Sequence, residues 1–187
     1  MTPSIRVVPP PSFTLYFLYT VALAFGAFIV YLYFNSTSGL PAEKAHEQLS
    51  GVLAILCLAG FFVGLVVWAV HRRSVTLSDT ELTIRAGFYT RKLKRSSLRM
   101  ESGIVTSLME QRTVAPRWRT NGIRVPGFQA GWFRLVNGEK ALVLLTDPRL
   151  VTYIKTSEGF SLLISTSDLL RALGEPAPEN GKLATDR

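Results

Sequence analysis

Charged residues, histidine and cysteine are all scarce in this sequence. Only 18% of its 187 residues are charged, below the roughly 25% usual in soluble domains. The one cysteine, Cys57, allows no intramolecular disulfide, and its apolar surroundings favour a small packing residue. Neither His46 nor His71 is placed to pair with Cys57, so a Cys–His catalytic pair is excluded.

Sequence motifs of common enzymes are missing as well. The chain has no phosphate-binding GxxxxGK[ST] loop, no GxGxxG, no HExxH and no CxxC. Glu43, His46 and Glu47 have the spacing of one helical face, but a solvated charged loop is favoured over a metal site. We therefore predict a protein that is not an enzyme and that has no cofactor and no bound metal.

Two acidic residues, Asp147 and Glu139, are the candidates for catalysis if the protein is an enzyme after all. Asp147 precedes a proline, which favours a turn-initiating role over a catalytic one. A catalytic site would need Asp147 or Glu139 in a deep pocket, beside Arg134 or Lys140, with a strongly shifted pKa.

The apolar residues that are present concentrate in two uncharged runs, residues 13–34 and 49–70. About 20 residues of helix cross the hydrocarbon core of a bilayer, so each run is long enough to span it. A cleaved signal peptide has a shorter apolar stretch, of about 7–15 residues. We predict two transmembrane helices joined by a loop at residues 35–48.

The flanking positive charges predict the orientation of this hairpin. The loop carries only Lys44, whereas Arg6, Arg72 and Arg73 flank the other ends of the two runs. Cytoplasmic flanks are enriched in Lys and Arg. We therefore expect the cell (inner or plasma) membrane, with both termini in the cytoplasm and the loop outside it.

Small residues within the two runs suggest helix packing. Gly60 and Gly64 form a GxxxG pattern, and Ala22 and Gly26 form a similar pair. Such pairs let helices approach closely in lipid. We expect the two helices of one chain to pack through them, with dimerisation as the alternative. Residues 1–12, which are rich in proline, are expected to form an extended lead-in.

Short alternating apolar segments replace the long runs after Ser74. They predict strands at 75–77, 82–84, 88–94 and 104–108, with a long loop around residues 111–122. Four further strands, at 132–136, 140–146, 151–156 and 160–165, are expected to form a meander. Asn137-Gly138 is typical of a two-residue type I′ turn. These features indicate a small antiparallel barrel or sandwich.

Alternation along residues 132–136 predicts which side chains face the core. Trp132, Arg134 and Val136 should share one face of the sheet, and Phe133 and Leu135 the other. A short helix with Leu169, Leu170 and Leu173 on one face should follow the strands. Residues 174–187 lack apolar periodicity and are expected to be a disordered tail.

The segment PGFQAGWFRLVNGEKALVLLTDPRLVTYIKTSEGFSLLIS, residues 126–165, resembles the bacterial pleckstrin-homology-like (PH-like) membrane proteins. The resemblance extends over residues 74–173. It implies a strongly bent, seven-stranded antiparallel sheet capped by a C-terminal helix, and a binding module with no reaction of its own. The final helix here is short for such a fold, and residues 95–125 depart from its regular strands.

Seventeen of the 21 Lys and Arg residues follow Ser74 and contribute most of the net charge of +8. They include two clusters near the expected bilayer, where each cation gains about 1 kcal/mol at an anionic leaflet. Contact with anionic lipid and a merely solvated face are about equally favoured, and nucleic acid is disfavoured because no recognition motif accompanies the charge. The candidate lipid-contact residues are Arg91, Lys92, Lys94, Arg95, Arg99, Arg117, Trp118 and Arg119, with Arg112 and Arg124 completing the second cluster.

Together these features favour a membrane-anchored PH-like module on the cytoplasmic face that binds or scaffolds a protein partner. The alternative is a module that binds anionic lipid headgroups. A lipid site would be a concave basic pocket near the membrane-proximal loops. A protein site would be an exposed sheet edge or apolar patch.

Overall fold

The computed structural model describes residues 4–5, 7–38 and 41–174. The chain divides into two compact units. Residues Ser12–Trp68 form a helical hairpin, and the second unit combines the N-terminal segment with the chain from Ala69 onward. The predicted disordered tail lies outside the described residues, apart from Gly174.

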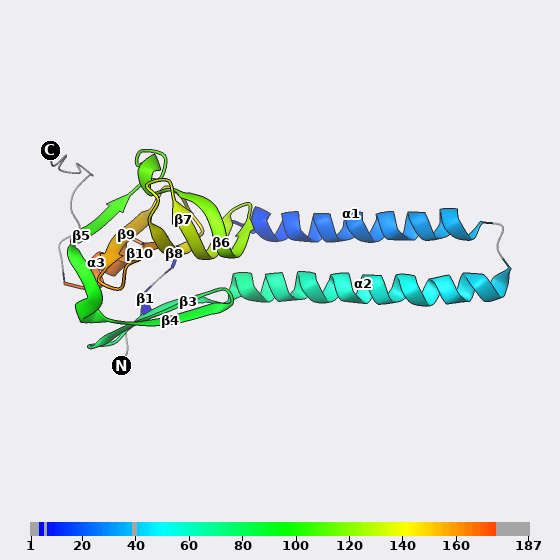
Figure 1. Cartoon of the computed structure of the whole chain (residues 1–187), viewed down its shortest axis with the longest axis horizontal. Coiled ribbons are helices and arrows are strands. Elements are labelled where there is room, and N and C mark those ends of the chain that lie inside the picture. Colours follow the sequence, from blue (N-terminus) through cyan, green and yellow to red (C-terminus); the bar gives the residue numbers. More distant parts are fainter. Residues whose placement is uncertain (1–3, 6, 39–40, 175–187) are drawn as a thin grey trace. The chain divides into compact units, whose positions relative to one another are not determined.

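The helical unit consists of α1 (Ser12–Thr37) and α2, which begins at Ala42 and ends at His71 in the other unit (Figure 1). Both helices are long and apolar enough to cross a membrane, over Ser12–Thr37 and Gln48–His71. They extend beyond the apolar runs, and α2 includes the charged residues that precede the second run. The expected membrane hairpin is thus present as two continuous helices.

The glycines of these helices do not pack as predicted. A Cβ atom added at Gly26, Gly60 or Gly64 would meet no atom within 4 Å, apart from the helix's own backbone. The expectation that the small residues bring α1 and α2 together is therefore wrong. The Ser36 hydroxyl instead donates a hydrogen bond to Oε1 of Gln48 across the hairpin, at 3.5 Å.

The first sheet has four strands in the order β1-β2-β3-β4. Their bounds are β1 Ser4–Ile5, β2 Arg73–Leu77, β3 Glu81–Ala86 and β4 Tyr89–Lys94. All neighbours are antiparallel, and alternation buries Val75, Leu77, Leu82 and Ile84 as strand periodicity requires. The strand β1 was not predicted, because the lead-in has no apolar period.

Two hydrogen bonds tie the lead-in to the second sheet as well. The Val8 N–H donates to the Ser165 carbonyl at 3.1 Å, and the Thr146 hydroxyl donates to the Val8 carbonyl at 2.6 Å. Ile5 is buried, with 7% of its surface exposed. The segment before the first helix is thus an integral part of the β unit, so a fragment that starts at Ser74 lacks one strand.

The second sheet has six strands in the order β5-β9-β10-β8-β7-β6. Their bounds are β5 Leu98–Thr106, β6 Pro116–Val125, β7 Phe128–Leu135, β8 Lys140–Leu145, β9 Val151–Thr156 and β10 Ser161–Ile164. The predicted four-strand meander is wrong, because β10 inserts between β9 and β8 and runs parallel to β8. The strand β10 is buried along its whole length, as a central strand is.

The segment between residues 95 and 125 is more regular than the sequence suggested. It contains two 3₁₀ turns, η1 (Arg95–Ser97) and η2 (Arg112–Val114), and the strands β5 and β6. The long loop expected around residues 111–122 is therefore wrong. Most of β6 is exposed, so it has no apolar alternation by which to recognise it.

The turn at Asn137-Gly138 also differs from the prediction. The Gly138 N–H donates to the Leu135 carbonyl at 3.0 Å, and the Leu135 N–H donates to the Glu139 carbonyl at 2.9 Å. These bonds enclose a three-residue loop rather than a two-residue type I′ turn. Gly138, at φ 83°, takes the left-handed position of a type I turn with a bulge.

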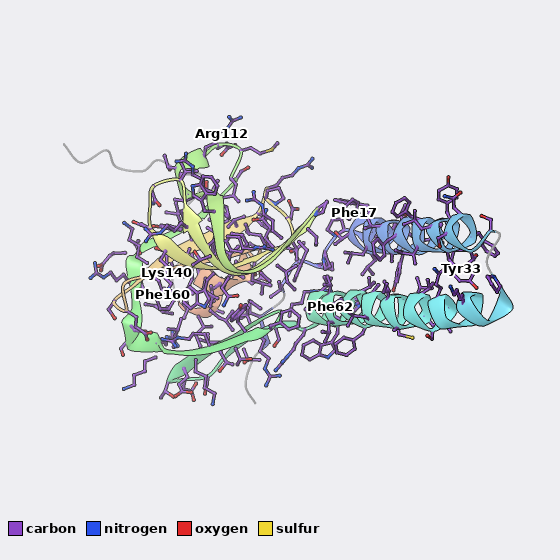
Figure 2. All side chains as sticks on the ribbon, turned by 45° about the vertical axis from the view of Figure 1, so that its right-hand side comes forward. Phe17, Tyr33, Phe62, Arg112, Lys140 and Phe160 are labelled. Carbon is purple, nitrogen blue, oxygen red and sulfur yellow. The ribbon has the colours of Figure 1, made fainter. Side chains whose placement is uncertain are left out.

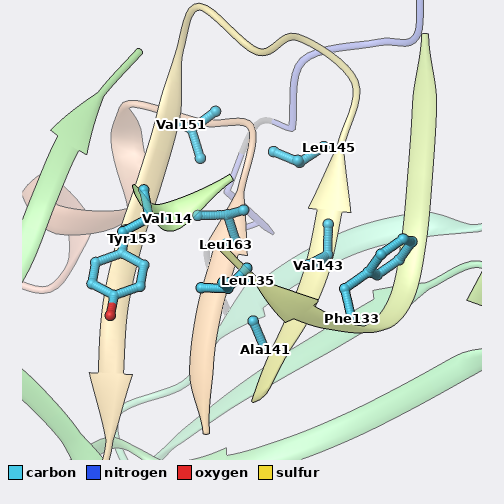
Figure 3. Packing of buried hydrophobic residues seen from close by; sticks show 9 residues of the cluster. All are labelled: Val114, Phe133, Leu135, Ala141, Val143, Leu145, Val151, Tyr153 and Leu163. Carbon is cyan, nitrogen blue, oxygen red and sulfur yellow. The ribbon is translucent and has the colours of Figure 1, made fainter. Parts of the chain in front are cut away.

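The core of the second sheet follows the predicted alternation. Phe133 and Leu135 are buried, whereas Arg134 and Val136 are exposed and Trp132 is partly exposed. Figure 3 shows nine buried side chains of a hydrophobic cluster in this sheet. They are Val114, Phe133, Leu135, Ala141, Val143, Leu145, Val151, Tyr153 and Leu163. The expected C-terminal helix is α3 (Asp168–Ala172), which buries Leu169 and Leu170.

Candidate functional site

The first predicted basic cluster does not form one surface. Its members are Arg91, Lys92, Lys94, Arg95 and Arg99. Arg91, on β4, forms an ion pair with Glu158 at 3.0 Å and lies 5.9 Å from the centre of the Phe160 ring. Arg95, in η1, donates a hydrogen bond to the Leu173 carbonyl at the end of α3, at 2.6 Å. Two of the five cations are thus committed to contacts within the domain.

The other three cations of this cluster lie on two different strands. Lys92 and Lys94 alternate with the buried Leu93 on β4 and are exposed. Lys94 lies directly opposite Glu81 in the sheet, which offsets its charge. Arg99 belongs to β5, in the second sheet, and lines a pocket there.

The second predicted cluster lies on one strand, apart from Arg112. Arg117, Trp118 and Arg119 are exposed residues of β6. The Arg117 guanidinium lies 5.6 Å from the centre of the Trp118 ring, which is a cation–π geometry. Nη1 of Arg124 donates to the Arg117 carbonyl at 3.1 Å. Arg112, in η2, is also exposed (Figure 2).

The strand β6 is the outer strand of its sheet. It pairs with β7 alone, and no described strand lies on its other side. The pairing shifts at two places near its start and is regular over Asn121–Val125. The sequence contains no Asp or Glu between Gln111 and Gly138. This edge is therefore an outer strand that carries positive charge and one exposed tryptophan.

A second site was missed by sequence reasoning. A pocket of about 270 Å³ lies where β5, β8 and the β9–β10 turn meet. Its cations come from positions that are far apart in the sequence, so no charge run marks it. The lining residues are Arg99, Glu139, Lys140, Lys155, Thr156, Ser157, Gly159, Phe160 and Ser161.

Glu139 holds a compact hydrogen-bond network in this pocket. Its Oε2 accepts hydrogen bonds from the Tyr153 hydroxyl at 2.5 Å and the Ser161 hydroxyl at 2.9 Å. Its Oε1 forms an ion pair with Lys155 at 2.9 Å. Burial raises the pKa of Glu139, but the three donors and the Lys155 charge outweigh it and leave the pKa below its usual value.

Neither acidic residue singled out for an enzymatic site has the required properties. Glu139 lies beside Lys140 in a pocket, but its lowered pKa keeps the carboxylate ionised and bound to three donors. Asp147 lines a different pocket, and its Oδ1 accepts the Arg149 N–H at 2.8 Å, as expected of a turn-initiating residue. This geometry is that of a structural network.

Tyr153 predicts how stability responds to alkaline pH. Burial and the hydrogen bond to Glu139 raise the pKa of Tyr153 from 10.0 to about 12. The unfolded chain therefore loses this proton first, and stabilisation that is complete below pH 10 is lost as the pH rises towards 12. Thermal unfolding of the full chain and of Tyr153→Phe across this range should show a steeper loss in the unmodified chain. An equal dependence of the unfolding temperature on pH in the two proteins would contradict this prediction.

The fold and these sites define a class of protein: a mainly antiparallel β domain with exposed sheet edges, of the kind that serves as a binding module, preceded by a two-helix membrane hairpin. A family model described as the bacterial PH domain matches residues 73–172, more than half of the chain. The chain therefore belongs to the bacterial PH domain family. No curated protein and no solved structure matches the chain.

Membership of this family confirms the resemblance inferred from the sequence, over nearly the same residues. The strands differ from what the resemblance implied. The matched residues contain nine strands, β2 to β10, divided between two sheets, and one neighbouring pair is parallel. The sheets are packed as in a sandwich and do not close into a barrel, and the final helix has five residues.

Proposed function

We propose that this protein is a membrane-anchored binding module that holds a protein partner at the cytoplasmic face of the cell membrane. The observation that carries the proposal is the exposed edge of β6. An open strand edge presents unpaired backbone donors and acceptors, to which an extended segment of another protein adds as a further strand.

The charge of this edge selects the chemistry of the partner. Arg117, Arg119 and Arg124 lie along β6, with no acidic residue in the strand. The regular pairing over Asn121–Val125 gives a length of strand on which another segment can align. Trp118, which is 64% exposed, adds an apolar anchor. We infer that the partner supplies an extended, acidic segment.

Lipid headgroups are the alternative ligand. Fewer of the predicted contact residues are available to bind them than the sequence suggested. Among the predicted contact residues, Arg91 and Arg95 are committed within the domain and Lys94 faces Glu81. Lys92, the β6 residues and Arg99, which lines a pocket in the second sheet, remain for a membrane surface. Charge reversal at β6 would weaken binding to a protein and to an anionic bilayer alike, so the two ligands must be offered separately.

The anchoring follows from the two helices. We propose that residues 13–34 and 49–70 cross the bilayer, that the loop at 35–48 is outside the cell and that the domain at 74–173 is cytoplasmic. The pairing of β1 with β2 supports this topology, because the segments at both ends of the hairpin then join one domain. The excess of arginines on that side supports the cytoplasmic assignment.

Cysteine labelling in whole cells tests the orientation. In a Cys57→Ser background, Ser38→Cys should react with a membrane-impermeant maleimide in intact cells, because the loop is outside. Thr113→Cys, in the exposed turn before β6, should react only after lysis. Labelling of Thr113→Cys in intact cells would reverse the topology and exclude a cytoplasmic partner.

Peptide binding tests the charge preference of the β6 edge. The full chain, in nanodiscs of uncharged lipid, should bind a labelled peptide of alternating Glu and Val more tightly than the same peptide with Lys in place of Glu. Changing Arg117, Arg119 and Arg124 to Glu should weaken binding of the acidic peptide at least about tenfold, because contacts with charged groups contribute about 1.5–3 kcal/mol each. Fluorescence anisotropy measures both affinities.

A matched variant controls for total charge. Changing Lys92, Lys94 and Arg171 to Glu alters the net charge equally, but at exposed positions away from β6. This variant should retain most of the affinity. Equal losses in the two variants, or equal binding of the acidic and basic peptides, would contradict a binding site at the β6 edge.

A further inference from the structure

The pocket beside the β9–β10 turn gathers positive charge from three strands. Arg99 comes from β5, Lys140 from β8 and Lys155 from β9. Their one acidic companion in the lining is Glu139. Figure 2 labels Lys140 and Phe160, which lie at this end of the second sheet. These cations come from separate strands, so they lie close together only in the folded domain.

Two of these cations lie opposite each other. Arg99 and Lys155 are register partners in the β5–β9 pair, immediately before the pairing shifts. Like charges directly opposite in a sheet are destabilising. Lys155 is partly neutralised by Glu139, whereas no described carboxylate forms an ion pair with Arg99. An anion bound between them would remove the repulsion.

Glu139 does not cancel the remaining charge of the pocket. Its two oxygens are taken up by Tyr153, Ser161 and Lys155. Lys140 lies 4.5 Å from the centre of the Trp132 ring, a contact that orients its ammonium group without neutralising it. Arg99 and Lys140 therefore supply two uncompensated charges to the pocket.

The size and donors of the pocket indicate the ligand class. A volume of about 270 Å³ admits a phosphate group and part of what it is attached to, but no large ligand. An arginine fork binds phosphate oxygens in pairs, and a lysine adds a point charge. Ser157 and Gly159, in the β9–β10 turn, also line the pocket. Arg99 and Lys140, which form no ion pair with a described carboxylate, match a doubly charged anion.

We propose that this pocket binds a phosphate monoester, either a soluble metabolite or the headgroup of a lipid. The site lies on β5, β8 and β9 and not on β6, so it is additional to the partner edge. Such a site would allow the domain to bind a phosphorylated ligand while it holds a protein. The outcome of the peptide-binding test does not decide whether this pocket binds phosphate.

Thermal unfolding of the full chain in nanodiscs of uncharged lipid tests the proposal. Glycerol phosphate is the soluble probe, and discs that contain phosphatidic acid present the same group on a lipid. Discs that contain phosphatidylglycerol, a diester, are the control. A ligand that binds only the folded state raises the unfolding temperature in a saturable manner. We expect such a rise with at least one monoester probe and a smaller one with the diester.

Substitutions locate the binding in this pocket. The double variant Arg99→Gln with Lys140→Gln should bind at least about tenfold more weakly, since each charged contact is worth about a factor of ten or more. Lys94→Gln with Arg171→Gln removes the same charge elsewhere and should bind as the unmodified chain does. Arg99→Lys keeps the charge and should retain most of the affinity, which separates loss of charge from loss of folding.

Each outcome decides the proposal. A saturable rise with glycerol phosphate that the double variant lacks supports a soluble ligand. A rise confined to phosphatidic acid discs, again absent from the double variant, supports a lipid headgroup. No saturable rise with either monoester, or equal losses in the double variant and its control, overturns the proposal.

Discussion

Replacing Gly131 with alanine is expected to destabilise the β unit by about 3–5 kcal/mol, the sum of backbone strain and overpacking. Gly131 has φ 117° and faces Gly122 of β6 as its register partner. A Cβ atom there would lie 2.6 Å from the Asn121 carbonyl oxygen and from the Gly122 Cα. These are backbone atoms that move only if β6 moves. Chemical denaturation of the full chain measures the loss.

Gly138→Ala is the matched control for this substitution. Gly138 also has a positive φ, of 83°, but a Cβ atom there would meet nothing within 4 Å. It should cost only about 1 kcal/mol, since left-handed backbone is unfavourable for other residues. Gly131→Ala should also reduce binding of the acidic peptide, because it displaces β6. Similar costs for the two substitutions would show that the close approach of β6 and β7 is unimportant.

Phe133→Ala is expected to cost about 3–5 kcal/mol, as large-to-small changes of buried aromatic residues do. Phe133 has no exposed surface and lies in the core cluster between β7 and its neighbours (Figure 3). The surrounding strands are paired on both sides and cannot close the cavity. The denaturation midpoint of the full chain should fall accordingly.

Trp132→Ala provides the comparison for Phe133→Ala. Trp132 is next in the chain but lies on the other face, where its ring meets the Phe160 ring edge-on at 5.0 Å. Its loss should cost about 1–2 kcal/mol, because an aromatic pair contributes about 0.5–1.5 kcal/mol beyond area burial. A larger cost for Trp132→Ala than for Phe133→Ala would contradict the observed alternation of β7.

The features that were predictable from the sequence are those with a strong local period. The two helices follow from uncharged runs longer than 20 residues, and the faces of β7 follow from the alternation around Phe133. The inserted position of β10 was not predictable. The strands β8, β9 and β10 are buried on both faces along nearly their whole length, so local pattern does not specify which pairs with which.

Two strands were missed because their sequences lack a period. The strand β1 has two residues, and its place depends on pairing with β2, some 70 positions further along the chain. The strand β6 reads as a polar loop because it is exposed on the outer edge of its sheet. Its recognition depends on the pairing of Gly122 with Gly131, which local sequence does not reveal.

Clusters along the sequence were a poor guide to clusters in space. Arg91 and Arg95 lie four residues apart, yet one pairs with Glu158 and the other with the end of α3. Arg91 lies on β4, whereas Arg95 lies in the 3₁₀ turn η1, where the chain leaves the strand. Arg99 and Lys155, which are distant in sequence, are register partners. Only the second predicted cluster remains largely together, with all its members except Arg112 on β6.

Photo-crosslinking in native membranes tests the central claim, a protein partner at the β6 edge, most directly. A photoreactive residue at Thr120, which is exposed on β6, should yield a crosslinked product. Mass spectrometry should place the bond in an Asp- and Glu-rich segment of another protein. Changing Arg117, Arg119 and Arg124 to Glu should remove the product, whereas the same probe at Arg171, exposed on α3, should not give it. Products with lipid alone, or a protein product that survives the charge reversal, would contradict the claim.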